Sequence, residues 1–196
     1  MTDQAERALD DARDVESSVH DPDRFTAVFD RYFAEIHRYA ARRLGPDAAD
    51  DIAADTFATA FGERRRFDAG RGMVRAWLYG IATNHIARYR RREVRGYRAM
   101  VRLGPDPAGE NHADRVVAMV AAGEVGRQLA GALAALSRGD REVLLLTALA
   151  GLSHAEIAVA LGIPYGTVGS RLSRVRKKLR AELAMITPDL EDGRNG

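Results

Sequence analysis

Apolar residues along this chain recur every three or four positions, which is the spacing of amphipathic helices, and no segment shows the alternation typical of a strand. In the first half this spacing predicts helices over residues 25–44, from about residue 47 to 61, and over residues 74–92. Gly45-Pro46 ends the first of them, and the polar residues 62–72 connect the second to the third. The positions expected to face inward are Phe25, Phe29, Tyr32, Ile36, Tyr39, Ile52, Phe57, Ala60, Phe61, Trp77, Leu78, Ile81, Ala82 and Ile86.

A second group of helices follows a segment rich in glycine and proline. We interpret this segment as a flexible linker, because glycine and proline interrupt helices. Helical spacing resumes near Asp114 and continues to the C-terminal region. The predicted fold class is therefore all-α, with two helical bundles joined by a flexible linker and a helix-turn-helix in the C-terminal bundle. The predicted boundaries are 1–22 for a disordered acidic tail, 23–95 for the first bundle, 96–113 for the linker, 114–186 for the second bundle and 187–196 for a disordered tail.

Residues 152–179 carry the pattern of a helix-turn-helix. Ser153 and Glu156 form a capping box, in which each side chain satisfies an amide left unpaired at the start of a helix. Gly162 supplies a permissive backbone at the turn, and an apolar stripe recurs along the second helix at Val168, Leu172, Val175 and Leu179. The other faces of this second helix are strongly basic. A capped first helix, a glycine turn and a basic second helix together indicate binding to duplex DNA.

Charge and composition narrow the function further. The net charge is only +2, but base collects in residues 88–102 and 171–180 and acid collects at the termini and in residues 47–55. Two separate basic blocks suggest two contacts with a polyanion. The chain has no cysteine, no secretory signal and no apolar run long enough to span a bilayer. We therefore expect a cytoplasmic protein with no membrane partner.

An enzyme and a simple DNA-binding regulator are the two alternatives from other classes. Asp47, Asp50, Asp51 and Asp55 could supply oxygen ligands to a metal, but the Glu-x-x-His spacing of helical metal sites is missing and the histidines are scattered. The sequence also offers no phosphate-binding glycine loop and no nucleophile with a base, so we expect no enzyme activity, cofactor or metal. A helix-turn-helix regulator that acts on DNA without a partner complex would explain residues 141–183 and would leave the first bundle without a function.

Two stretches in this order resemble the extracytoplasmic-function (ECF) class of bacterial sigma factors. The first stretch is Asp51-Ile52-Ala53-Ala54-Asp55-Thr56-Phe57, followed by Trp77-Leu78-Tyr79-Gly80-Ile81-Ala82-Thr83-Asn84 and Arg90-Arg91-Arg92. The second comprises residues 133–136, 140–143 and 151–172. The resemblance implies a subunit that gives core RNA polymerase its promoter choice. In that class the first bundle, region 2, binds the clamp helices of the largest subunit and opens the minus-10 element, while the second, region 4, contacts the flap region and reads the duplex minus-35 element.

The resemblance and the side-chain chemistry together give candidate site residues. Polymerase binding is assigned to Asp50, Asp51, Asp55 and Phe57, because Asp51 and Asp55 stand one turn apart on an acidic face. Contacts with the opened, single-stranded minus-10 element are assigned to Phe67, Asp68, Arg71, Asn84, Arg88, Arg90 and Arg91; Asn84 can offer an unstacked base both a donor and an acceptor. Contacts with the minus-35 duplex are assigned to Tyr165, Thr167, Ser170, Arg171, Arg174, Lys177, Lys178 and Arg180.

Three positions depart from the pattern of the class. Ala54 replaces a common glutamine, Arg88 stands where aspartate is frequent, and Gly169 occupies a position that is often basic. Each change is expected to alter affinity or promoter preference without altering the fold. Trp77 invites interpretation as a stacking residue, but its helical spacing with Leu78 and Ile81 favours a place in the core. An anti-sigma protein is a further partner that the resemblance implies.

Overall fold

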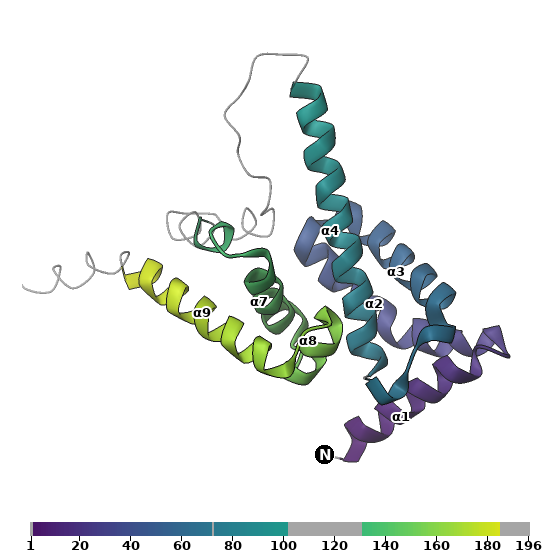
Figure 1. Ribbon diagram of the computed structural model, residues 1–196. Coiled ribbons are helices and arrows are strands. Elements are labelled where there is room, and N and C mark those ends of the chain that lie inside the picture. Colours follow the sequence, from purple (N-terminus) through teal and green to yellow (C-terminus); the bar gives the residue numbers. More distant parts are fainter. Residues whose placement is uncertain (1, 72, 102–130, 185–196) are drawn as a thin grey trace, which may run out of the picture.

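The computed structural model describes residues 2–71, 73–101 and 131–184 (Figure 1). The first bundle contains the helices α1 (Thr2–Ser17), α2 (Phe25–Leu44), α3 (Ala49–Glu63) and α4 (Val74–Val101), and the second contains α7 (Arg138–Ala150), α8 (His154–Leu161) and α9 (Tyr165–Ala184). Short 3-10 turns lie at Pro22–Arg24, Pro46–Ala48, Arg64–Arg66 and Ala69–Arg71. None of the described residues forms a strand, and the all-α prediction is confirmed.

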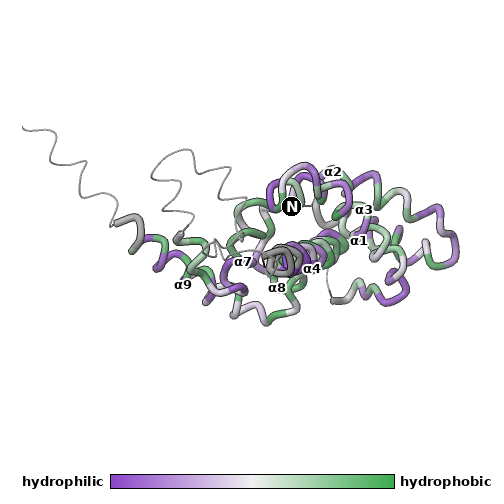
Figure 2. Tube along the Cα trace, turned by 90° about the horizontal axis from the view of Figure 1, so that it is seen from above, coloured by the Kyte–Doolittle hydropathy of each residue, from purple (hydrophilic) through white to green (hydrophobic). Residues whose placement is uncertain are grey.

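The two bundles lie against each other, with α8 packed on α4 between them. Figure 2, a view down α4, shows α7 and α9 on one side of this contact and the remaining helices of the first bundle on the other. None of the helices within the described residues is long and apolar enough to cross a membrane.

The core of the first bundle lies where α2, α3 and α4 meet. The predicted apolar stripes supply it with Ile36, Tyr39, Ile52, Leu78 and Ile86, all of which are buried. Gly45 ends α2 with a φ of 93°, a conformation that glycine adopts without strain. Two of the residues expected to face inward lie at the surface instead. They are Phe29 and Phe61.

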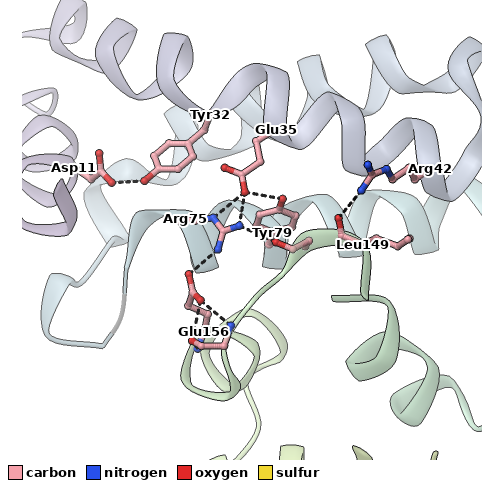
Figure 3. Close-up of polar contacts among 10 residues, drawn as sticks. Asp11, Tyr32, Glu35, Arg42, Arg75, Tyr79, Leu149 and Glu156 are labelled. Carbon is pink, nitrogen blue, oxygen red and sulfur yellow. Dashed lines mark hydrogen bonds and ion pairs between the residues drawn. The ribbon is translucent and has the colours of Figure 1, made fainter. Parts of the chain in front are cut away.

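The N-terminal segment differs from the expected disordered tail, because residues Thr2–Ser17 form α1, which packs on α2. Val15 is buried, and the Asp11 side chain, in a residue only 2% exposed, accepts hydrogen bonds from the Tyr32 hydroxyl and the Arg31 guanidinium. Burial raises the pKa of Tyr32, so its hydroxyl stays protonated and able to donate. The prediction of disorder was wrong because α1 has few large apolar residues, although its Val15 joins the core and its Asp11 binds Tyr32 (Figure 3) and Arg31.

We expect Asp11→Ala to lower the free energy of unfolding by about 1 kcal/mol, because the Tyr32 hydroxyl loses its acceptor in a buried position. Asp10→Ala is the matched control: its carboxylate is exposed on the same helix, and the change should stay below about 0.5 kcal/mol. Denaturant titration of both variants measures the difference. Equal stabilities would show that the bonds of Asp11 do not stabilise the bundle.

The third predicted helix is longer than expected. α4 continues to Val101 and therefore includes residues 96–101, which the sequence assigned to the linker. A single glycine inside a helix costs only about 1 kcal/mol, and the residues near Gly96 include good helix formers, namely Arg95, Arg98, Ala99 and Met100. The rest of the predicted linker, the expected helical start of the second bundle and the C-terminal tail lie outside the described residues.

In the second bundle, capping residues and glycines that are recognisable in the sequence set where the helices begin and end. Ser137 caps α7 by accepting the Asp140 amide at 3.2 Å, and Gly151 ends this helix with a φ of 61°. The predicted capping box of α8 is present: Ser153 accepts the Glu156 amide, and the Glu156 carboxylate accepts the Ser153 amide at 2.8 Å. Gly162, with a φ of 60°, makes the predicted turn into α9. The apolar stripe of α9 is buried at Val168, Leu172 and Val175.

Candidate nucleic-acid interface

The N-terminal half of α3 presents an acidic face. Asp50, Asp51 and Asp55 are exposed, and the spacing of Asp51 and Asp55 places them one turn apart on the same side. Asp50 lies 3.0 Å from Nε2 of His37, and Asp55 lies 3.8 Å from Nδ1 of His85. This face carries negative charge toward solvent and suits a basic partner.

Phe57 does not lie on this surface, although the sequence analysis assigned it to the same binding site. It is 4% exposed and packs in the core, because its position on α3 faces α2. Its ring lies 5.0 Å from that of Phe29, measured between centroids, and Phe29 is 39% exposed on α2. Phe29 is therefore the aromatic side chain that a partner could reach here. Sequence reasoning missed it because Phe29 belongs to the apolar stripe of α2 and was assigned to the core.

The connection between α3 and α4 contains Phe67 and Asp68. The Phe67 ring lies 5.1 Å from the Trp77 ring, and Trp77 is half-buried against the core, as its spacing predicted. The exposed Asp68 carboxylate accepts the Gly70 amide at 2.9 Å and so fixes a turn. Arg71 ends the short helix that follows this turn. These contacts order the segment that the sequence analysis assigned to an unstacked base.

Asn84 is exposed on α4, two turns beyond Trp77 on the same helix face and about 10 Å along its axis. Its neighbour Thr83 is buried and bonds the Tyr39 hydroxyl at 3.2 Å, which fixes the register of α4 against α2. His85 lies partly buried with Nε2 2.9 Å from the Thr59 hydroxyl. Burial lowers the pKa of His85, and Arg88 and Arg92 lower it further, against an opposing effect of Asp55. The positive charge of this surface therefore comes from arginines.

The basic block of α4 separates into exposed and engaged arginines. Arg88 and Arg91 are exposed, whereas Arg90 is half-buried and donates to the Arg43 carbonyl at 2.7 Å, where it closes the end of α2. Arg92 and Arg95 are also exposed and extend the same stripe by helical spacing. The exposed stripe suits a polyanion, and the structure gives Arg90 a bond within the bundle.

The second helix of the helix-turn-helix, α9, carries its polar residues on two sides. Tyr165, 63% exposed, and Ser170 and Lys177 face solvent, Thr167 is half-buried, and Arg180 is exposed further along. The other predicted cations lie toward the start of α7, where Arg174 pairs with Asp140 at 3.0 Å and Lys178 donates to the Ala135 carbonyl at 2.7 Å. Arg171 is half-buried, with its guanidinium beside Gly139.

The electrostatics of Asp140 follow from this arrangement. Burial opposes its ionisation, but the hydrogen bonds with Arg174 and Ser137 hold the pKa of its carboxyl below the ordinary value. Asp140 is therefore ionised at neutral pH and holds Arg174 along the flank of α9. Among the described residues no group of His, Asp and Glu is arranged to hold a metal ion.

Comparison with known proteins covers both bundles. A family model described as sigma-70 region 2 matches residues 28–96, and one described as sigma-70, region 4 matches residues 126–179. The ECF RNA polymerase sigma factor SigC of Mycobacterium tuberculosis is 34% identical over 154 residues, which cover 76% of this chain and 77% of SigC. SigW of Bacillus subtilis, also an ECF RNA polymerase sigma factor, is 33% identical over 174 residues, which cover 83% of this chain and 90% of SigW.

The fold also matches a solved structure. CnrH, an RNA polymerase sigma factor of Cupriavidus metallidurans, was solved in complex with the cytosolic domain of CnrY. The structural match has a TM-score of 0.59 and 26% sequence identity, and it covers 90% of this chain and 98% of that one.

Proposed function

The chain belongs to the ECF-type RNA polymerase sigma factors, and we propose that its first bundle opens the minus-10 element of a promoter while its helix-turn-helix reads the minus-35 element as duplex. Sigma factors are non-catalytic subunits that bind core RNA polymerase and promoter DNA and direct transcription initiation through regions 2 and 4. The polymerase-independent regulator would use only the second bundle. The observation that carries our proposal is the presence, in one chain, of an acidic helix face and two separate basic helices.

Core polymerase binding is assigned to the acidic face of α3. Asp50, Asp51 and Asp55 are exposed, and Phe29, which is exposed and contacts Phe57 of α3, adds apolar area. A charged face with an aromatic neighbour suits the clamp helices of the largest subunit, since charge complementarity steers association and an aromatic anchor adds affinity. Phe57 supports this surface from beneath. The second bundle would meet the flap region.

Opening of the minus-10 element is assigned to the segment from Phe67 to the arginines of α4. Extracting a base from the stack costs a few kcal/mol, which a pocket and backbone contacts must offset. Asn84 would bond the edge of such a base, and Phe67, Asp68 and Arg71 in the preceding connection would supply further contacts with the opened strand. Arg88 and Arg91 would hold phosphates, together with Arg92 and Arg95, while Arg90 serves mainly to close α2.

Reading of the minus-35 element is assigned to α9. Its N-terminal part carries Tyr165, Thr167, Ser170 and Arg171, the part of a recognition helix that meets base edges in the major groove. Arg174 lies one turn further on, and Lys177, Lys178 and Arg180 would contact phosphates, which position the helix without reading sequence. Asp140 would either hold Arg174 in the orientation in which it contacts a base or lose its ion pair when Arg174 binds a base.

We propose the domain boundaries that the sequence predicts, with two changes. We assign region 2 to residues 23–95 and region 4 to residues 114–186, with α1 added to the first bundle and α4 continuing to Val101. The solved complex of CnrH with CnrY supports a further proposal, that a protein partner of this chain binds it and withholds it from polymerase, as an anti-sigma factor would.

The polymerase-binding proposal is tested by charge reversal. Asp51→Lys combined with Asp55→Lys should weaken binding to core polymerase by about tenfold or more, because two attractive contacts become repulsive. Glu16→Lys combined with Asp23→Lys makes the same change in net charge at exposed positions away from α3 and should leave binding intact.

Co-elution of each purified variant with core polymerase, followed by titration, measures the effect, and circular dichroism checks that helix content is unchanged. Wild-type protein that bound promoter duplex but failed to co-elute with core polymerase would favour the polymerase-independent regulator. Equal loss of affinity in both pairs would remove the assignment to α3.

A further inference from the structure

We propose that the first turn of α7, through Gly139 and Asp140, positions Arg171 and Arg174 of α9 and thereby sets the base preference of the helix-turn-helix. This inference rests on the proposed function, because it concerns how the side chains that read the minus-35 element are held. Gly139 and Asp140 act through the two arginines and not by contact with DNA. They are therefore positioning residues.

The guanidinium of Arg171 lies against the backbone of Gly139. A Cβ atom added to Gly139 would stand 2.7 Å from Nη1, 2.8 Å from Cζ and 3.1 Å from Nη2 of Arg171. Because Cζ is as close as the two nitrogens, the flat face of the guanidinium covers the place that a Cβ would occupy. Arg171 is half-buried in this position. Only glycine leaves room for the guanidinium to lie there.

The backbone at Gly139 does not itself require glycine. This residue lies inside the first turn of α7, and its φ is not positive, unlike that of Gly151 and Gly162. Alanine would therefore suit the helix better than glycine does. The atoms that a methyl group would meet belong to the end of a flexible side chain, so the fold can accept alanine by moving the guanidinium. Position 139 thus controls where Arg171 points and has little control over the fold.

Arg174 is held by the next residue of the same turn. Its Nη2 lies 3.0 Å from Oδ1 of Asp140, and its side chain is still 60% exposed, so its other donors remain open to a base. Burial raises the pKa of the Asp140 carboxyl, but bonds with Arg174 and Ser137 and the charges of both arginines lower it more. The carboxylate therefore stays charged near Arg171 and Arg174 at neutral pH.

The turn that holds the two arginines is itself anchored. Arg141, which follows Asp140, donates to three carbonyls of the preceding segment at distances between 2.7 and 3.2 Å. These carbonyls belong to Leu133, Ala134 and Leu136. Lys178 of α9 donates to the Ala135 carbonyl of the same segment at 2.7 Å. Arg171, Arg174 and Lys178 share one side of α9 by helical spacing, so this side meets residues 135–140 at three points.

A guanidinium that is held in one direction reads a base more selectively than a mobile one. Arginine recognises guanine through two parallel bonds, to O6 and N7, and both form only when the guanidinium plane meets the edge of the base. A side chain that is already ordered also loses less conformational entropy on binding. A change at position 139 should therefore alter the preference at one base pair and leave the contacts with phosphates unchanged.

A randomised DNA pool tests the role of Gly139 without a known promoter. Duplexes with a randomised segment are bound by the full chain in complex with core polymerase, and sequencing of the bound fraction gives the preference at each base pair. Arg171→Ala identifies the base pair that Arg171 reads. Gly139→Ala should lower the preference at that base pair about three- to tenfold, because the bidentate geometry is disturbed, and should leave the other base pairs unchanged.

Two controls separate positioning from a general structural effect. Gly131→Ala is the matched control, because nothing lies within 4 Å of a Cβ at this exposed helical glycine of the same bundle, and it should keep the wild-type preference. Gly139→Ala combined with Arg171→Ala should select the same sequences as Arg171→Ala alone, since position 139 acts only through this arginine. Circular dichroism checks that helix content is unchanged in every variant.

The outcomes separate this inference from the proposed function. If Gly139→Ala keeps the wild-type preference at the base pair that Arg171 reads, the inference fails. It also fails if Gly139→Ala weakens binding further in the Arg171→Ala background, because the effect then does not pass through the arginine. If Arg171→Ala relaxes no base pair, Gly139 has no reading residue to position and the inference fails, although a sequence preference of the wild-type chain would still support the proposed function. A wild-type chain that selects no duplex sequence would overturn both.

Discussion

Replacing Asn84 with alanine should slow formation of the open complex on a duplex promoter by about 5- to 150-fold. The exposed amide offers the unstacked base a donor and an acceptor, and leaving such groups unpaired costs about 1–3 kcal/mol. On a template with a preformed bubble from the minus-10 element to the start site, the defect should be far smaller, because unstacking no longer depends on the protein. Permanganate reactivity of thymines in the minus-10 element measures the opened fraction over time.

Thr26→Ala is the control for this variant, since Thr26 is also polar, exposed and helical but lies at the start of α2. It should open both templates at the wild-type rate. If Asn84→Ala were equally defective on the duplex and on the bubble, Asn84 would act in holding the bundle or the polymerase rather than in capturing a base.

The cations of α9 should separate into residues that read sequence and residues that only bind. Alanine at Arg171 or Arg174 should relax preference at particular minus-35 bases by about 1–3 kcal/mol, the value of a good bidentate contact. Alanine at Lys178 or Arg180 should weaken binding evenly across sequences and flatten its salt dependence by about 0.9 per lost phosphate contact. Salt titrations of each variant against matched and mismatched duplexes distinguish the two kinds of contact.

Asp140→Asn adds a structural check on this separation. It removes the charge that pairs with Arg174 at 3.0 Å, and so should change base preference at the position that Arg174 reads while leaving that of Arg171 intact. Should all four alanine variants lose affinity equally on every sequence, α9 does not read the promoter in the way proposed.

The elements predicted correctly are those specified by local signals. α2, α3 and α4 follow from apolar spacing, and the helix-turn-helix follows from the Ser153–Glu156 capping box and the turn at Gly162. α1 was missed because its anchor joins Asp11 to Tyr32, residues far apart in the chain with no periodic signature. The end of α4 was misplaced because one glycine was given more weight than its helix-forming neighbours.

The candidate site was predictable in part for the same reason. Helical spacing placed Asp51, Asp55 and Asn84 on exposed faces, and the structure has them there. The same spacing placed Phe57 on the inward stripe, where it is buried, so its assignment to polymerase binding conflicted with that pattern. Helical spacing could not show that Arg43 and Glu142, 99 positions apart, would form a buried pair. The sequence also does not show which arginines of α4 form bonds within the protein, as Arg90 does, and which remain exposed.

The two oxygens of the Glu156 carboxylate have partners in different bundles (Figure 3), and this has a thermodynamic consequence. Glu156 gives one oxygen to the Ser153 amide, within its own helix, and the other to Arg75, across the interface. When the bundles part, the first bond stays, so α8 keeps its cap and the helix-turn-helix remains whole. Parting would also expose apolar residues of the one core cluster that the two bundles share, so it carries a positive heat capacity change. The enthalpy of parting should therefore rise with temperature, and the logarithm of the equilibrium constant for parting should follow a curved van't Hoff plot over the range in which both bundles stay folded.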